Sequence, residues 1–423
     1  MNKKISIIGL GYVGLPLALA FQKYYRVCGY DVNQSRIQEL KKGFDSNCEF
    51  KSNKITNFKN IFFSSRISDI SDSDFIIVTV PTPVNKKNQP DLKPLSIACK
   101  QISRYIKKKS IIIFESTVYP SCTENFCIPL LENGSGKKIN KDFYVGYSPE
   151  RINVGDNKHT LEKITKIVSA SSSSSKKKVK ELYSRIIKAG VHVCPNIMTA
   201  EAAKAIENAQ RDINIAFINE ISIIFNKLGL KSSDVLRAAK TKWNFLNFTP
   251  GLVGGHCIGV DPYYLTYIAE YIGVNPKVIN AGRTINDKMH YELGKIFLKK
   301  IKYNFQELKK FNLLILGLSF KENTNDIRNS KVFDLCFYLK KLGHSVYVYD
   351  PLVKKNISNK NFVFKNRLDF SKKFHGIFLA VPHLKILKKI RLITQKTKKN
   401  AVLFDFKNSL SSTQMKKISK LLL

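Results

Sequence analysis

The 423-residue sequence predicts an α/β protein with two doubly wound parallel sheets, joined by a long central helix and a helical middle segment. Three observations support this prediction. A short apolar strand at residues 4–8 runs directly into a glycine-rich turn and a helical apolar pattern. From Thr199 to about Lys227 the spacing of apolar residues is strongly helical and rich in alanine. A second α/β pattern begins near residue 311 with a strand that ends in glycine, and further strands alternate with helical segments after it.

The first turn, Gly9-Leu10-Gly11-Tyr12-Val13-Gly14, has GxGxxG spacing between a strand and a helix, which is the setting that a dinucleotide site requires. Gly9 permits the tight turn, Gly11 lets a diphosphate approach the backbone, and Gly14 lets the helix pack on the strand. The turn, with Tyr12 and Val13, brings the diphosphate to the amino end of the helix. We therefore predict a Rossmann-like domain that binds a dinucleotide.

The second strand, residues 27–30, ends in Asp31, where a carboxylate accepts hydrogen bonds from the adenosine ribose hydroxyls. A carboxylate there repels a 2′-phosphate, so the predicted cofactor is NAD rather than NADP. Arg36 is the one feature that disagrees. It receives less weight because it lies on the following helix, but it remains a candidate cofactor-binding residue.

Polar residues follow three further strands of the first domain. Thr82 follows the strand at 74–80, Thr117 follows the strand that ends at Glu115, and Glu150 and Arg151 follow the strand at 143–147. Ligands of doubly wound sheets lie beyond the carboxyl ends of the strands. These positions are therefore candidates for a pocket. A carboxylate at such a strand end, as Glu150 is, more often has a functional role than none.

The long central helix carries a stripe of polar residues. Lys204 and Asn208 are four residues apart and share one helix face, and Asp212 extends the stripe. A solvated lysine is the plain alternative for Lys204 in a chain with so many lysines. A helix of this length, about 43 Å at 1.5 Å per residue, commonly joins domains or forms a dimer interface.

The run Gly254-Gly255-His256-Cys257-Ile258-Gly259-Val260-Asp261-Pro262 predicts a nucleophilic cysteine on a tight loop. Paired glycines allow a ligand to approach closely, and a carboxylate four residues on can hold a water or a partner near the sulfur. The alternative is that Cys257 is a small buried apolar residue, as most free cysteines are.

The second α/β pattern begins at residues 312–318, continues through Ser319-Phe320-Lys321 to Asp326 and Arg328, and has a second strand that ends in Asp350. It lacks a full glycine fingerprint, so we expect it to bind a nucleotide other than a dinucleotide. The expected domains are an NAD-binding domain at 1–195, a central helical domain at 196–300 and a second nucleotide-binding domain at 301–423, which the family resemblance given below assigns to a UDP-sugar.

The composition excludes several classes of protein. The formal net charge is +39, from 71 Lys+Arg against 32 Asp+Glu, but the lysines are spread along the whole chain and do not indicate a nucleic-acid groove. The eight cysteines form no CxxC pair, and neither a structural metal nor a disulfide framework is expected. No signal peptide and no apolar stretch of about 18 residues is recognised, so we expect a cytoplasmic protein without membrane insertion.

With these motifs assembled, the chain resembles the UDP-glucose/GDP-mannose dehydrogenase family from residue 4 to about residue 408. Its cysteine run, with Gly259-Val260-Asp261 in place of the Pro-Lys-Asp of the UDP-glucose branch, is most similar to the branch that acts on UDP-N-acetylhexosamines, with UDP-N-acetylglucosamine as the best candidate. The resemblance implies a four-electron oxidation of the sugar C6 alcohol to a carboxylate with two NAD, through a thiohemiacetal and a thioester on Cys257.

The resemblance also assigns roles to residues. The implied catalytic residues are Cys257, Lys204, Asn208, Asp261, Glu150 and Thr117. The implied cofactor-binding residues are Gly9, Gly11, Tyr12, Val13, Gly14, Asp31, Arg36, Thr82, Thr117 and Arg328. The implied substrate-binding residues are Glu150, Arg151, Lys204, Asn208, Gly255, Arg283 and Lys321.

One departure concerns thioester hydrolysis. The UDP-glucose branch has a second glutamate four residues after the first, where this chain has Val154, so hydrolysis is expected to depend on Glu150, Thr117 and Asp261. His256 is a marker of the branch and not an expected base.

The alternatives are a UDP-N-acetylmannosamine, UDP-N-acetylgalactosamine or GDP-mannose dehydrogenase, a two-electron dehydrogenase that would not need Cys257, and a non-catalytic nucleotide-sugar-binding protein. A homodimer or higher homo-oligomer is expected, in the synthesis of a surface polysaccharide such as capsule or O-antigen.

Overall fold

The computed structural model describes residues 3–46, 60–152, 160–256, 258–354, 357–410 and 419–423. These residues divide into two compact units. Unit 1 comprises residues 1–207 and 263–275, and unit 2 comprises residues 208–262 and 276–423. Within the described ranges, no helix is both long and apolar enough to cross a membrane. The predicted boundaries of three domains, at 195 and 300, remain a prediction.

Unit 1 is built on a sheet in which the described residues form eight strands, in the order β3-β2-β1-β4-β5-β6-β7-β8. The strands are β1 (Lys4–Ile8), β2 (Arg26–Tyr30), β3 (Ile61–Ser64), β4 (Phe75–Val78), β5 (Ile111–Phe114), β6 (Tyr144–Tyr147), β7 (Lys166–Ala170) and β8 (Val191–Val193). All neighbouring pairs are parallel except β6 and β7, which are antiparallel. The sequence analysis did not predict this reversal.

Apolar side chains alternate between the two faces of this sheet. Ile5 and Ile7 of β1 pack in one core with α1 (Gly14–Phe21) and α5 (Ser173–Ser184), whereas Ile8 packs in the other with α3 (Lys93–Ser103) and α4 (Ile128–Ser135). The helix α2 (Gln34–Lys41) follows β2, and α8 (Asp261–Tyr271) contributes most of its length to this unit. Because helices cover both faces of the sheet, the central strands consist almost entirely of apolar residues.

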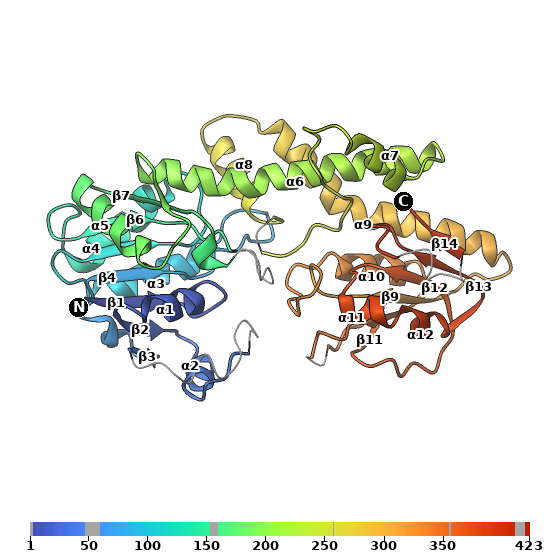
Figure 1. Ribbon diagram of the computed structural model, residues 1–423, viewed down its shortest axis with the longest axis horizontal. Helices are drawn as coiled ribbons and strands as arrows, with labels where there is room; N and C mark the ends of the chain where they lie inside the picture. The colour runs from blue at the N-terminus through green and yellow to red at the C-terminus, as the bar shows by residue number, and fades with distance from the viewer. Residues whose placement is uncertain (1–2, 47–59, 153–159, 257, 355–356, 411–418) are drawn as a thin grey trace. The chain divides into compact units, whose positions relative to one another are not determined.

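Unit 2 contains a parallel sheet whose described strands run in the order β11-β10-β9-β12-β13-β14. They are β9 (Asn312–Leu316), β10 (Ser345–Tyr349), β11 (Val363–Lys365), β12 (Phe374–Leu379), β13 (Thr397–Phe404) and β14 (Ser419–Leu421). The helices α9 (Lys277–Asn304) and α10 (Val332–Lys341) pack on one face, and α11 (Leu384–Lys388) and α12 (Ile390–Thr394) on the other. The prediction of two doubly wound domains is confirmed (Figure 1).

The predicted central helix is α6 (Ile197–Lys227), 31 residues long and drawn in green in Figure 1. A shorter helix, α7 (Ser232–Ala239), follows it. The observed start at Ile197 lies two residues before the predicted one, and the predicted end at Lys227 is confirmed. Lys204 and Asn208 therefore lie one turn apart on a continuous helix, and both side chains are buried.

Candidate functional site

The glycine-rich turn of unit 1 has the geometry that its spacing predicts. Gly9 has φ +94°, a conformation that L side chains rarely adopt, and its N–H donates to the carbonyl of Tyr30 at 2.8 Å. A Cβ on Gly14 would lie 1.8 Å from the carbonyl oxygen of Gly9, whereas a Cβ on Gly11 would meet nothing within 4 Å. Gly14 is thus required for packing, and Gly11 leaves the backbone open to a diphosphate.

Asp31 holds this turn from the end of β2. Its Oδ2 accepts the N–H of Leu10 at 2.8 Å, and its Oδ1 accepts the N–H of Asn33 at 2.9 Å. Two ionised oxygens accept about four hydrogen bonds. Among the described residues, these two donors therefore leave capacity for the hydroxyls of a ribose.

Arg36 does not provide a free site for a 2′-phosphate. Its side chain is buried, its Nε donates to the carbonyl of Leu10 at 3.0 Å, and its Nη2 lies 2.8 Å from Oδ1 of Asp45. The guanidinium thus stabilises the glycine turn through the carbonyl of Leu10. Arg36, the one feature that disagreed with NAD, is therefore bound to groups of the protein and does not argue for NADP.

Replacing Asp31 by asparagine tests the predicted contact with ribose. Asparagine keeps an oxygen for the N–H of Leu10 but loses the charge that attracts two hydroxyls, so we expect KM for NAD to rise about 10-fold, equivalent to ~1.4 kcal/mol. Initial rates at varied NAD measure it, with KM for the sugar nucleotide unchanged. Asp142→Asn is the matched control, because Asp142 also accepts a backbone N–H of unit 1, at 2.9 Å from Lys138. An unchanged KM for NAD in Asp31→Asn would contradict the assignment.

The structure brings Thr82 and Thr117 together at the carboxyl edge of the sheet. The hydroxyl of Thr82 donates to the carbonyl of Thr117 at 2.6 Å, and the hydroxyl of Tyr264 on α8 donates to the carbonyl of Thr82. Two segments that follow β4 and β5 are thus joined directly. The sequence analysis missed Tyr264, which lies two residues beyond the quoted cysteine motif.

Glu150 lies three residues beyond β6, and both of its carboxylate oxygens are held. Oε1 accepts the N–H groups of Arg151 at 2.6 Å and Ile152 at 2.5 Å, and Oε2 lies 3.3 Å from Nζ of Lys166. Arg151 makes an ion pair with Glu207 at 2.7 Å and donates to the carbonyl of Thr165. The sequence analysis did not single out Lys166.

In unit 2, the structure joins two predicted catalytic residues. The amide nitrogen of Asn208 lies 2.5 Å from Oδ2 of Asp261, and both side chains are buried. Cys257 lies outside the described residues. Arg283 is buried between Asp212, at 2.7 Å, and Asp287, at 2.6 Å, and its predicted contact with substrate remains a prediction.

The loop around Cys257 packs against the loop that follows β9. Gly255 has φ +85°, and a Cβ there would lie 2.6 Å from the ring of Phe320. A Cβ on Gly254 would lie 2.5 Å from the carbonyl oxygen of Asn329, whose amide nitrogen lies 3.3 Å from the carbonyl of Gly255. Any side chain at these glycines would push the two loops apart. The glycines therefore set the distance between the cysteine motif and the Phe320-Lys321 motif.

Beside these loops, burial and the charge of Arg328 shift the pKa values of His256 and Asp326. Burial and the nearby charge of Arg328 lower the pKa of His256, which favours its neutral form. Arg328 forms a bidentate pair with Asp326, with Nε 2.9 Å from Oδ1 and Nη2 2.7 Å from Oδ2. Although burial opposes it, the pairing with Arg328 lowers the pKa of Asp326. The predicted contact of Arg328 with NAD remains a prediction.

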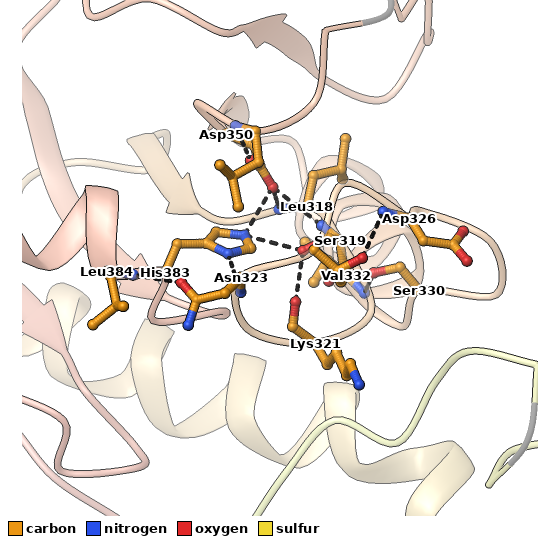
Figure 2. A network of polar contacts seen from close by, with 12 residues as sticks. Leu318, Ser319, Lys321, Asn323, Asp326, Ser330, Val332, Asp350, His383 and Leu384 are labelled. Carbon is orange, nitrogen blue, oxygen red and sulfur yellow. Dashed lines mark hydrogen bonds and ion pairs between the residues drawn. The ribbon is translucent and has the colours of Figure 1, made fainter. Parts of the chain in front are cut away.

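Unit 2 repeats the turn of unit 1, with one change. Gly317 has φ +87° and donates to the carbonyl of Tyr349 at 2.8 Å, and Oδ2 of Asp350 accepts the N–H of Leu318 at 2.8 Å, as Asp31 accepts that of Leu10. However, Asp350 is fully buried, and Nε2 of His383 covers the same oxygen at 3.1 Å (Figure 2). The ribose-binding position of a dinucleotide is thus closed in this domain. This supports the prediction of a different nucleotide.

A small pocket opens beside this turn. It is lined by Phe320, Lys321, Lys331 and Lys407 together with Leu252, Ser319, Ser330, Val332, Ala380 and Val381. Lys331 is paired with Asp287 at 2.9 Å and Lys407 with Glu322 at 2.5 Å. The lysines among the lining residues are compatible with an anionic ligand such as a diphosphate, and two of them share their charge with the carboxylates of Asp287 and Glu322.

Comparison with known proteins follows the same three parts of the chain. Residues 3–187 match the NAD-binding domain of the UDP-glucose/GDP-mannose dehydrogenase family, residues 198–288 its central domain, and residues 314–412 its UDP-binding domain. The chain belongs to this family. It is therefore an NAD-dependent oxidoreductase whose substrate is a UDP-sugar, as the sequence analysis predicted.

Several relatives are similar over most of their length. UDP-N-acetyl-D-glucosamine 6-dehydrogenase of Salmonella typhi is 49% identical over 83% of this chain and 82% of its own, and protein CapL of Staphylococcus aureus is 46% identical over 98% of both. Among solved structures, the UDP-N-acetyl-mannosamine dehydrogenase Cap5O of S. aureus is 28% identical, with a TM-score of 0.86 over 99% of this chain and 98% of its own.

The glycine turn of unit 1 fits the NAD of this family. Gly11 is open, the turn cannot accept a side chain at Gly14, and Asp31 presents a carboxylate beside it. NAD bound there supplies the acceptor for hydride. Within the described residues, no group of three or more His, Cys, Asp and Glu side chains is arranged to hold a metal ion.

Proposed function

We propose that the chain is a UDP-N-acetylglucosamine 6-dehydrogenase that oxidises C6 of the sugar from alcohol to carboxylate with two NAD. The observation that carries the choice of sugar is the level of identity. The relatives from S. typhi and Pseudomonas aeruginosa that are named for this sugar are 49% and 46% identical, whereas the archaeal UDP-N-acetyl-D-mannosamine dehydrogenases are 30–31% identical. UDP-N-acetylmannosamine and UDP-N-acetylgalactosamine are the competing substrates.

The first oxidation needs a base for the C6 hydroxyl proton. We assign it to a water held by Asp261 and Lys204. The bond from Asn208 fixes the Asp261 carboxylate, and among the described residues the second N–H of the amide meets no acceptor. Lys204 and Asn208 then stabilise the oxyanion by charge and hydrogen bond.

The second oxidation needs a covalent intermediate. The thiolate of Cys257 adds to the aldehyde carbon to give a thiohemiacetal, which loses a hydride to become a thioester. The ammonium of Lys204 favours the thiolate form of the cysteine. Water then attacks the thioester carbon, the carbon–sulfur bond breaks and the acid leaves.

Hydrolysis is assigned to Glu150 and Thr117, which position the attacking water. The fixed orientation of the Glu150 carboxylate supports this role. Val154, where a second glutamate would stand in the UDP-glucose branch, lies outside the described residues.

The UDP-sugar is assigned to the pocket beside Gly317, with Lys321 at its diphosphate. Gly255, Arg151 and Arg283 complete the proposed substrate contacts. A homodimer or higher homo-oligomer, a place in the cytoplasm and a role in surface-polysaccharide synthesis remain proposals.

A panel of UDP-sugars tests the proposed function. We expect UDP-N-acetylglucosamine to give the highest kcat/KM and two NADH for each acid formed, measured by absorbance and by mass spectrometry of the product. UDP-N-acetylmannosamine and UDP-N-acetylgalactosamine are the matched competitors, since each inverts one group. One NADH for each sugar would refute the thioester route, and no NADH with any sugar would favour the non-catalytic binding protein.

A further inference from the structure

Glu150 belongs to a buried polar cluster of four side chains. The ammonium of Lys166 is 2.7 Å from Oε2 of Glu115 and 3.3 Å from Oε2 of Glu150, and the hydroxyl of Tyr183 donates to Oε1 of Glu115. The side chains of Lys166 and Glu115 are 3% and 0% exposed, and that of Glu150 is 10% exposed. We call these residues the Lys166 cluster. The catalytic scheme above uses only Glu150 from it.

The cluster exists because one strand of the sheet is reversed. β7 pairs with β6 in antiparallel register, with Tyr147 opposite Ser169 and Gly146 opposite Ala170. Continued by three residues, this register sets Lys166 opposite Glu150. The first residue of a reversed strand thus reaches the carboxyl edge of the sheet, where Glu115 also lies, immediately after β5.

In this cluster the ammonium of Lys166 forms ion pairs with both Glu115 and Glu150. Burial raises the pKa of Glu115 to about 7, and repulsion from Glu150 adds to this, although Lys166 opposes both. Despite burial, the two carboxylates raise the pKa of Lys166, so the ammonium keeps its proton. Burial raises the pKa of Tyr183 well above its usual value, so its hydroxyl stays protonated and donates.

These contacts fix the orientation of the Glu150 carboxylate and leave part of its hydrogen-bonding capacity unused. Among the described residues, two backbone N–H groups and one ammonium contact its oxygens, fewer than the four hydrogen bonds that they can accept. The carboxylate is held in one orientation with capacity for a further donor. A water is the donor that thioester hydrolysis requires.

We propose that Lys166 is the positioning residue for Glu150, and that Glu115 and Tyr183 hold its ammonium in place. In the step that this serves, water adds to the thioester carbon and the carbon–sulfur bond breaks. The thiolate of Cys257 leaves, and the proton from water passes to the Glu150 carboxylate. The inference rests on the proposed function, because it needs Glu150 to act in hydrolysis. Lys166 acts only through Glu150 and contacts no reacting atom.

Replacing Lys166 by methionine separates hydrolysis from oxidation. Without the cation, the Glu150 carboxylate loses the contact that orients it, so we expect thioester hydrolysis to slow about 10–100-fold. Stopped-flow absorbance should show a burst of two NADH per active site and then a slow steady state, and intact-protein mass spectrometry should show the acyl adduct on Cys257. Lys166→Arg, which keeps the charge, should recover most of kcat.

The pH dependence of hydrolysis separates positioning from a purely structural role. Among the described residues, the charged or titratable groups that interact with Glu150 are Lys166 from β7, Glu115 after β5 and Tyr183 from α5. Lys166→Met removes a cation and should move the acidic limb of kcat to higher pH. Glu115→Gln should leave that limb nearly unchanged, because burial raises the pKa of Glu115 to about 7 and its carboxyl is already largely protonated there. A cluster that serves only folding predicts equal midpoints in both variants, and that result would overturn the proposal.

Three further variants distinguish the possible outcomes. Glu115→Gln/Lys166→Met removes one charge of each sign and serves if Lys166→Met does not fold; it should still show the burst, and its absence would count against the proposal. Lys188→Met is the matched control, because Lys188 pairs with Glu162 at 3.3 Å but is 84% exposed, and its kinetics should match the wild type. If Glu150→Gln hydrolyses the thioester normally, the assigned role of Glu150 fails. If only Lys166→Met hydrolyses it normally, this inference fails alone.

Discussion

We expect the replacement of Cys257 by alanine to abolish acid formation, lowering the rate of acid release at least about 1,000-fold. In the proposed mechanism, the second oxidation needs a carbon that bears both a hydrogen and an oxyanion, and the cysteine adduct provides it. The first oxidation does not need the sulfur, so at most one NADH per sugar should appear. NADH yield and product mass, measured together on the purified enzyme with UDP-N-acetylglucosamine, test both statements.

Two variants sharpen this test. Cys257→Ser should accumulate an ester, because an alkoxide is a poorer leaving group than a thiolate, and intact-protein mass spectrometry would detect it. Cys194→Ala removes a buried cysteine outside the motif and should retain wild-type stoichiometry. Acid formation at a normal rate in Cys257→Ala would show that the nucleophile is wrongly assigned.

The parts of the site that the sequence predicted are those built by residues close together in the chain. Gly9, Gly11 and Gly14 occupy one turn, and Asp31 reaches that turn from the next strand, so spacing alone identifies them. Asn208 and Asp261 were each named as catalytic residues through the resemblance, but the contact between their side chains, across 53 residues, was not predicted.

The parts that were missed depend on the direction of strands and on long-range contacts. Lys166 is an ordinary lysine in the sequence and acquires partners only because β7 runs antiparallel, which apolar periodicity does not reveal. Tyr264 meets Thr82 across 182 residues, and His383 meets Asp350 across 33. Arg36 was given low weight for its place on a helix, whereas the physical reason is its pairing with Asp45 and Leu10.

The second large effect concerns the stability of unit 2. Asp350→Ala should lower the free energy of unfolding by about 3–5 kcal/mol, because several buried donors lose their acceptor at ~1–3 kcal/mol each. These donors are the N–H groups of Leu318 at 2.8 Å, Ser319 at 3.2 Å and Leu352 at 2.9 Å, and Nε2 of His383 at 3.1 Å. Thermal unfolding of the full chain should show a transition lowered by roughly 10 °C.

Asp350 stabilises the turn partly through His383, whose tautomer is fixed by its other hydrogen bonds. Nδ1 of His383 accepts the N–H of Asn323 at 2.8 Å, so the proton of the neutral ring lies on Nε2 and points at Asp350 and Ser319 (Figure 2). Asp350→Asn keeps one acceptor oxygen and should cost less than Asp350→Ala. Asp369→Ala, which breaks an exposed pair with Lys365, should leave the transition unchanged. Equal melting temperatures for Asp350→Ala and the wild type would show that the turn after β9 is held by its glycine and its packing alone, and the closed ribose-binding position would then need another cause.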